Sequence, residues 1–276
     1  MAQNSEIIGM IAGGGQFPLL IAEAAKKHGV RMIAVAHHNE TEPSLSDKVD
    51  EIVWIKLGQL GHLIKAFKES GVRNALMAGT ITKKRMFENI RPDLKGLTLM
   101  SKLPFFHDDD ILKAVTKELA REGIEIISST RFLPELLAPE GCLTARKPDK
   151  AEREDVHFGW KMAKELGRLD LGQCVVVRKK TVLAVEAIDG TDATILRGGR
   201  LAGEKAVVVK VSKPNQDLRF DVPCVGLGTI KAMSRVRCAV LAVEKGCTLL
   251  FDKSEMIAEA DRENISIISL GTAPAP

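Results

Sequence analysis

The sequence predicts an α/β protein built from two domains, and three observations carry this prediction. The chain opens with a strand, glycine turn, helix, strand order typical of a parallel sheet. Around residue 138 the regular apolar periodicity stops and a proline-, glycine- and charge-containing stretch follows. The 276 residues are enough for two ordinary domains with a sizeable core. We therefore predict an N-terminal domain over 1–137, a linker over 138–150 and a C-terminal domain over 151–276.

The first element of the N-terminal domain is a short apolar strand over 7–12, which breaks into three glycines at 13–15. A helical pattern begins at Leu19 and runs to Gly29, and a second apolar strand covers 30–36. Because a strand, a helix and a second strand are most simply completed as a right-handed parallel unit, this domain is predicted to be Rossmann-like.

The glycine turn is a candidate anion site, formed by Gly13, Gly14, Gly15, Gln16 and Phe17. Backbone N–H groups at a glycine turn and a helix N-terminus can bind a phosphate. A tight βα turn without a ligand explains the glycines equally well. Dinucleotide binding is disfavoured, since a proline follows where the third glycine of that fingerprint is needed and no acidic residue ends the second strand.

Further strands are predicted over 51–55, 74–78 and 124–128, with helices over 60–70 and from about 111 to 119. The strand over 74–78 ends in a basic turn that contains Thr80, Lys83 and Arg85. Ligands of open parallel sheets bind beyond the carboxyl ends of the strands, so this turn is expected beside the glycine turn. A solvated run of charge is the alternative.

The second half is predicted to be mixed α+β. Helices are expected over 152–166 and 254–264, and strands over 173–177, 181–185, 193–196, 206–211, 239–243 and 248–251. An Asp189-Gly190 pair within the polar segment 186–192 predicts a hairpin turn. Candidate ligand-binding residues in that segment are Glu186, Gly190, Thr191 and Asp192.

The stretch from Lys213 to Pro223 is the densest polar segment of the chain. If it is extended, Asp217, Arg219 and Asp221 point the same way, because strand side chains alternate. Lys213 and Gln216 lie close by in sequence, and Thr229 follows after a glycine-containing turn. Carboxylate oxygens are the ligands of hard cations such as Mg²⁺ or Mn²⁺. A surface strand with alternating charge for solubility is the competing interpretation.

The amino-acid composition makes some classes of function less favoured than others. The net charge of +4 favours anionic partners only weakly, and 4% aromatic residues with no tyrosine argue against nucleic-acid binding. The five cysteines are widely spaced and mostly in apolar surroundings, which favours a reducing compartment. Neither a leader-like N-terminus nor an apolar run of membrane-spanning length is present, so we expect a cytoplasmic protein.

Several motifs resemble one known family, the LpxI-type UDP-2,3-diacylglucosamine pyrophosphatases. The resemblance rests on Gly13-Gly14-Gly15-Gln16-Phe17-Pro18, the segment 136–141, Asp170-Leu171-Gly172-Gln173, the segment 184–192 and the stretch from Lys213 to Pro223. It covers nearly the whole chain, and the last two motifs are specific.

The resemblance implies Mg²⁺-dependent hydrolysis of UDP-2,3-diacylglucosamine to UMP and 2,3-diacylglucosamine 1-phosphate (lipid X) in lipid A synthesis of Gram-negative bacteria. By position it makes Asp221 the essential aspartate of the family. We expect Asp221 to be a metal ligand or water-orienting base and Asp217 to be a second acidic member of the metal site. Lys213 and Arg219, with Lys83, are expected to stabilise charge. It also implies a homodimer and allows peripheral contact with the cytoplasmic face of the inner membrane. A non-catalytic nucleotide-sugar sensor or lipid carrier is the rival hypothesis.

Overall fold

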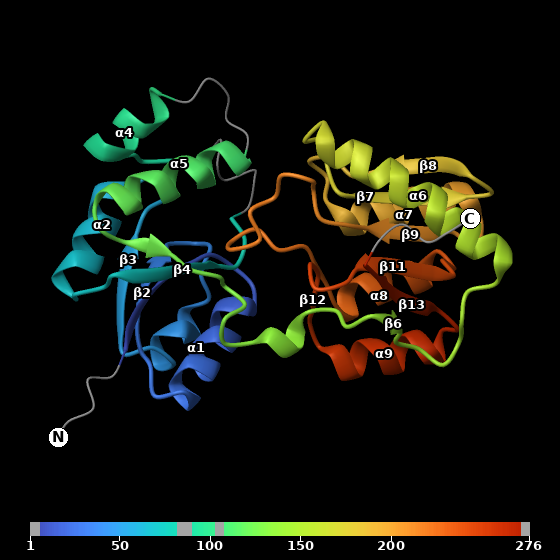
Figure 1. Cartoon of the computed structure of the whole chain (residues 1–276), viewed down its shortest axis with the longest axis horizontal. Helices are drawn as coiled ribbons and strands as arrows, with labels where there is room; N and C mark the ends of the chain where they lie inside the picture. Colours follow the sequence, from blue (N-terminus) through green and yellow to red (C-terminus); the bar gives the residue numbers. More distant parts are fainter. Residues whose placement is uncertain (1–5, 82–89, 103–107, 272–276) are drawn as a thin grey trace. The chain divides into compact units, whose positions relative to one another are not determined.

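The computed structural model describes residues 6–81, 90–102 and 108–271. The chain divides into two compact units, Met1–Pro134 and Glu135–Pro276 (Figure 1). Each unit has its own sheet and its own buried core, so the two are described separately below.

The first unit is built on a five-stranded sheet in the order β3-β2-β1-β4-β5. Its strands are β1 (Ile7–Ala12), β2 (Arg31–His37), β3 (Glu51–Ile55), β4 (Asn74–Ala78) and β5 (Glu125–Ile126). All neighbouring strands are parallel. Connections run through α1 (Phe17–Lys27), η1 (Pro43–Asp47), α2 (Leu60–Glu69), α4 (Leu94–Met100) and α5 (Asp108–Arg121). This strand order confirms the predicted Rossmann-like domain.

The second unit is built on a six-stranded sheet in the order β6-β13-β11-β9-β7-β8. Its strands are β6 (Gly141–Cys142), β7 (Cys174–Arg178), β8 (Thr181–Val185), β9 (Val207–Lys210), β11 (Val240–Glu244) and β13 (Ser266–Leu270). β11 is parallel to β9 and β13, whereas β6, β7 and β8 pair antiparallel with their neighbours. A separate pair joins β10 (Cys224–Val225) to β12 (Leu249–Leu250). The predicted mixed C-terminal domain is confirmed.

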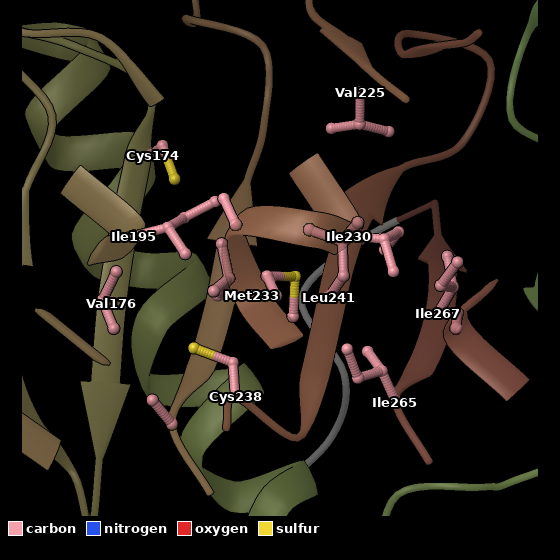
Figure 2. Packing of buried hydrophobic residues seen from close by; sticks show 14 of the residues in the cluster. Cys174, Val176, Ile195, Val225, Ile230, Met233, Cys238, Leu241, Ile265 and Ile267 are labelled. Atoms are coloured by element: carbon pink, nitrogen blue, oxygen red, sulfur yellow. The ribbon is translucent and has the colours of Figure 1, made fainter. Parts of the chain in front are cut away.

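Helices cover both faces of this six-stranded sheet. The helix α6 (Lys150–Arg168) packs Val156, Trp160 and Ala163 against one face. The helices α7 (Thr191–Ala202), α8 (Leu227–Arg235) and α9 (Lys253–Arg262) cover the other, where Ile195 and Met233 are fully buried (Figure 2). Neighbouring strand residues serve opposite faces, as the pleat requires. The strands are therefore continuous apolar runs, as expected of strands buried on both faces.

The segment 191–202 corrects two predictions. The strand predicted over 193–196 is part of the helix α7, and Gly190 caps that helix in place of the predicted hairpin turn. Gly190 has a φ of 81°, a conformation that favours glycine, and the helix begins at the next residue. A short apolar run fits a strand or a helix equally well, and here the face formed by Ile195, Gly198 and Gly199 belongs to a helix.

The segment 138–150, predicted as a linker, contains elements of the second unit. Its residues Gly141–Cys142 form β6, which pairs with β13. Its last residues begin α6, where Asp149 and Glu152 form a capping box. A two-residue strand has no detectable periodicity, which is why the sequence pattern did not indicate it. The elements α8 and β13 were not predicted either.

Candidate active site

Polar candidates of the second half gather at one edge of the six-stranded sheet. The parallel strands β9, β11 and β13 end there, and the antiparallel pairing brings the start of β7 and the end of β8 to the same edge. Predicted residues in segments that leave or reach this edge are Glu186, Gly190, Thr191, Asp192, Lys213, Gln216, Asp217, Arg219, Asp221 and, in the first turn of α8, Thr229. The sheet topology thus brings together residues that are up to 43 positions apart in the numbering of the sequence.

The loop that follows β9 is folded on itself rather than extended. The backbone N–H groups of Phe220 and Asp221 both donate to the Asp217 carbonyl, at 3.2 and 3.0 Å. This turn overturns the prediction of an extended segment in which alternate side chains share one face. Pro214 and Pro223 do limit strand pairing, but they do not force the residues between them to be extended.

A chain of side-chain contacts orders this loop around Gln216. The Lys213 backbone N–H donates to Gln216 Oε1 at 2.8 Å, and Gln216 Nε2 donates to Asp221 Oδ2 at 2.6 Å. The Lys213 ammonium donates to Asp170 Oδ1 at 2.6 Å. Asp170 belongs to a motif noted in the sequence, although it was not among the predicted site residues. Gln216 therefore links the start of the loop to the Asp221 carboxylate.

Asp217 forms a close ion pair with Arg219. The guanidinium Nε lies 2.9 Å from Asp217 Oδ1, and Nη2 lies 2.7 Å from Oδ2. The Arg219 side chain is 47% exposed and that of Asp217 is 23% exposed. Because both carboxylate oxygens contact the guanidinium, a metal ion at Asp217 competes with Arg219.

A second polar chain runs through Glu186, Thr191 and Lys210. Lys210 Nζ donates to Thr191 Oγ1 at 2.8 Å, and Thr191 Oγ1 donates to Glu186 Oε1 at 2.6 Å. The other Glu186 oxygen accepts the backbone N–H of Gln173 at 3.1 Å. Glu186 and Thr191 were predicted to bind substrate or a cation, and that role stays a prediction. In the structure Thr191 contacts Lys210 directly, and Glu186 is linked to this lysine through the Thr191 hydroxyl.

Lys210 is a residue that the sequence analysis missed. It is 6% exposed, and its ammonium also donates to the Cys224 carbonyl at 2.8 Å. A buried ammonium needs hydrogen bonds and a nearby negative charge, which here is Glu186 across one hydroxyl group. The available signal was a lysine inside the valine run of 207–211.

At the ends of β9 and β11, a third cluster joins Lys164, Ser212 and Glu244. Lys164 Nζ lies 2.8 Å from each Glu244 carboxylate oxygen, and Ser212 donates to Glu244 Oε2 from both its backbone N–H and its hydroxyl. This cluster fixes the point at which the chain leaves β9 toward Lys213. It too was not predicted.

The carboxylates of the loop after β9 are the candidate ligands for Mg²⁺. The described residues contain no group of three or more His, Cys, Asp or Glu side chains that could hold a metal ion. Magnesium at phosphate groups commonly takes one or two carboxylates and completes its shell with phosphate oxygens and water. Asp217 and Asp221, which share one turn, fit that smaller requirement.

The glycine turn of the first unit forms close backbone contacts with the end of β4. The Gly13 N–H donates to the Ala78 carbonyl at 2.8 Å, and the Gly14 N–H donates to the Thr80 carbonyl at 2.7 Å. A Cβ atom on Gly13 would lie 2.6 Å from the Thr80 carbonyl oxygen, so only glycine fits there. These two N–H groups are therefore engaged within the protein, and the tight approach by itself requires glycine.

Three further candidates of the first unit, Gln16, Phe17 and Thr80, lie around this turn. Gln16 caps α1, and Phe17, at the first position of that helix, is buried. Thr80 is placed beside Gly14 by a backbone bridge, as the sheet topology predicted. Lys83 and Arg85 lie outside the described residues.

Taken together, the chain is a two-unit α/β protein whose second unit presents carboxylates, lysines and an arginine at the carboxyl edge of its sheet. The sequence model of the LpxI N-terminal domain matches residues 7–136, and that of the LpxI C-terminal domain matches residues 139–268. A protein of Caulobacter vibrioides named UDP-2,3-diacylglucosamine pyrophosphatase LpxI is 32% identical over 278 residues, which span 97% of this chain and 98% of the relative. The chain belongs to the LpxI family.

Two solved structures are remotely similar to this chain. The urea amidolyase of K. lactis and the urea carboxylase of Kluyveromyces lactis each match 43% of this chain at 13% identity, with TM-scores of 0.27 and 0.28. The matches span 6% and 9% of those chains, and scores this low carry no argument. No helix within the described part of the chain is both long and apolar enough to cross a membrane.

Proposed function

We propose that this protein hydrolyses the diphosphate of UDP-2,3-diacylglucosamine to UMP and 2,3-diacylglucosamine 1-phosphate (lipid X), a step of lipid A synthesis, by attack of water on the α-phosphorus. Membership of the LpxI family and the activity named for the Caulobacter relative support the reaction. The structural observation that carries the assignment is the ordered turn that holds Asp221 through Gln216 beside Lys213.

Each polar residue of this turn has a separate role in the proposed reaction. Asp221, which accepts a hydrogen bond from Gln216, would hold the metal or accept a proton from the attacking water. Lys213 and Arg219 offset the negative charge that the diphosphate brings and that the leaving group gains. A bound Mg²⁺ would neutralise phosphate charge and lower the pKa of water, with Asp217 and Asp221 as its protein ligands.

In this proposal the first unit recognises the nucleotide or the sugar of the substrate. We assign recognition of the uridine or the sugar to Gly15, Gln16 and Phe17 with Thr80, at the carboxyl edge of the five-stranded sheet. Lys83 and Arg85 follow in sequence and are assigned to the anion. A homodimer, a cytoplasmic location and peripheral contact with the inner membrane complete the proposal.

The test is hydrolysis of UDP-2,3-diacylglucosamine by the purified protein in heavy-oxygen water, with Mg²⁺ or with EDTA, followed by mass spectrometry of both products. We expect label in UMP and loss of turnover in EDTA. Label in the sugar phosphate would move the attack to the β-phosphorus, and full turnover in EDTA would remove the metal from the proposal.

The Asp221→Asn variant distinguishes the hypothesis of an enzyme from that of a non-catalytic binding or carrier protein. Asparagine keeps an oxygen that can accept from Gln216 but removes the charge, so turnover should fall by at least about a hundredfold while substrate binding persists. Asp189→Asn, in the same unit and paired with Arg197, is the matched control and should keep full turnover. A wild-type protein that binds the substrate and never cleaves it would favour the carrier.

A further inference from the structure

Exposed apolar side chains are unevenly distributed over the described residues. Seven large hydrophobic side chains are exposed there, and four of them belong to two short segments at the edge of the second sheet. These four are Leu169 at 57%, Leu171 at 59%, Val185 at 39% and Ile188 at 71% exposure. Scattered apolar residues are normal on a surface, whereas exposed apolar residues that gather in neighbouring segments indicate an interaction site.

The two segments lie side by side. The Glu186 backbone N–H donates to the Cys174 carbonyl at 2.8 Å, and the Gln173 N–H donates to the Glu186 carboxylate at 3.1 Å. A Cβ atom on Gly172 would lie 2.3 Å from the Glu186 carbonyl oxygen, so the chain after Leu171 touches the chain after Val185. We call the four exposed side chains the apolar rim.

The apolar rim is continuous with the polar site. Asp170, between Leu169 and Leu171, accepts a hydrogen bond from the Lys213 ammonium. Glu186 follows Val185 directly and accepts a hydrogen bond from the Thr191 hydroxyl, which in turn accepts one from the Lys210 ammonium. One edge of the sheet therefore presents apolar side chains next to cations and carboxylates, an arrangement that matches an amphiphile with an anionic head and a hydrocarbon tail.

We propose that the apolar rim receives an acyl chain of the amphiphilic substrate. This inference rests on the proposed function and extends it to the residues that contact the lipid. An acyl chain is the occupant because the rim adjoins the residues assigned to the diphosphate, and the same substrate carries both groups. Removing its methylene groups from water supplies the binding energy.

The test uses the double variant Leu171→Ser with Ile188→Ser and two substrates, UDP-2,3-diacylglucosamine with long acyl chains and an analogue with short, water-soluble chains. We expect kcat/KM for the long-chain substrate to fall by about tenfold, and that for the short-chain analogue to change little. The matched control is Leu201→Ser. Leu201 is 68% exposed and lies at the C-terminal end of α7, away from Thr191 at its start, so both values should stay at wild type.

Binding of lipid X analogues of both chain lengths, measured by calorimetry, keeps the test independent of turnover. Wild-type protein that hydrolyses neither substrate would refute the proposed function, and a chain-length dependence of binding that the double variant abolishes would still support the rim. Equal losses for both chain lengths, or none, would overturn the rim as an acyl site. Impaired binding to vesicles with unchanged substrate affinity would assign the rim to a membrane surface instead.

Discussion

The ammonium of Lys210 donates a 2.8 Å hydrogen bond to the hydroxyl of Thr191, the first residue of α7. Because Thr191 passes a hydrogen bond on to Glu186, a buried cation and a buried carboxylate share one hydroxyl group. The same ammonium binds the Cys224 carbonyl, at the end of the loop that contains Asp221. Lys210 thereby connects β9, α7 and both ends of the candidate catalytic loop.

Replacement of Lys210 by methionine should destabilise the second unit and disturb this loop. Methionine fills the space but leaves Glu186 without its cation and the Cys224 carbonyl without a donor. We expect the free energy of unfolding to fall by about 1–3 kcal/mol, measured by urea denaturation. The control is Lys231→Met on the exposed face of α8, which should change it little. An unchanged unfolding midpoint for Lys210→Met would show that the hydrogen bonds of Lys210 add no net stability.

Replacement of Arg219 by glutamine tests whether Asp217 binds Mg²⁺. The guanidinium contacts both oxygens of Asp217, so its removal should make that carboxylate more available to the metal. The half-saturating Mg²⁺ concentration should then fall, by at most about fivefold because the pair is partly exposed. The maximal rate should fall as well, since a charge-stabilising group is lost.

The comparison for this experiment is Arg197→Gln, which breaks a partly exposed pair with Asp189 in the same unit. It should leave the Mg²⁺ dependence unchanged. If Arg219→Gln and Arg197→Gln give the same half-saturating concentration as wild type, Asp217 is not a metal ligand and Asp221 alone remains a candidate.

The first unit shows what a sequence pattern can predict. Its first four strands and the helices α1 and α2 are separated by clear turns, so their order follows from periodicity and gives the parallel sheet. The helix α4 was not predicted, and β5 is shorter than the predicted strand. The pattern of 193–196 was insufficient, because a run of four residues, three of them apolar, fits a strand or one turn of helix. The competing signal was Gly190, which can end a strand in a hairpin or begin a helix.

The sequence indicated which residues belong to the candidate loop, but it did not indicate the conformation of that loop. Asp217, Gln216 and Asp221 do lie in one loop, but that loop is a turn, and its internal hydrogen bonds depend on backbone angles that charge spacing does not determine. Lys210 was missed because its position in a valine run gives no sign of the hydroxyl and carbonyl that neighbouring elements supply.

The pH dependence of stability should report on His37, at the end of β2. Burial lowers the pKa of its imidazole, although the hydrogen bond of Nδ1 with the Ala12 carbonyl, at 3.0 Å, acts in the opposite direction. In the unfolded chain histidine has a pKa of about 6.5. As the pH falls below that value the unfolded state binds a proton that the folded state resists, so stability present above pH 6.5 is lost by up to about 1.4 kcal/mol per pH unit.

His37→Asn removes the titrating group, and its side-chain amide can still donate to the Ala12 carbonyl. We therefore expect urea denaturation at pH 7.5 and 5.5 to show a smaller loss of stability for His37→Asn than for wild type. His62→Asn, whose side chain on α2 is 60% exposed, serves as the comparison and should keep the wild-type loss. Equal losses for wild type and His37→Asn would mean that the buried imidazole accepts a proton as readily as in the unfolded chain, which would contradict the sign derived from its burial.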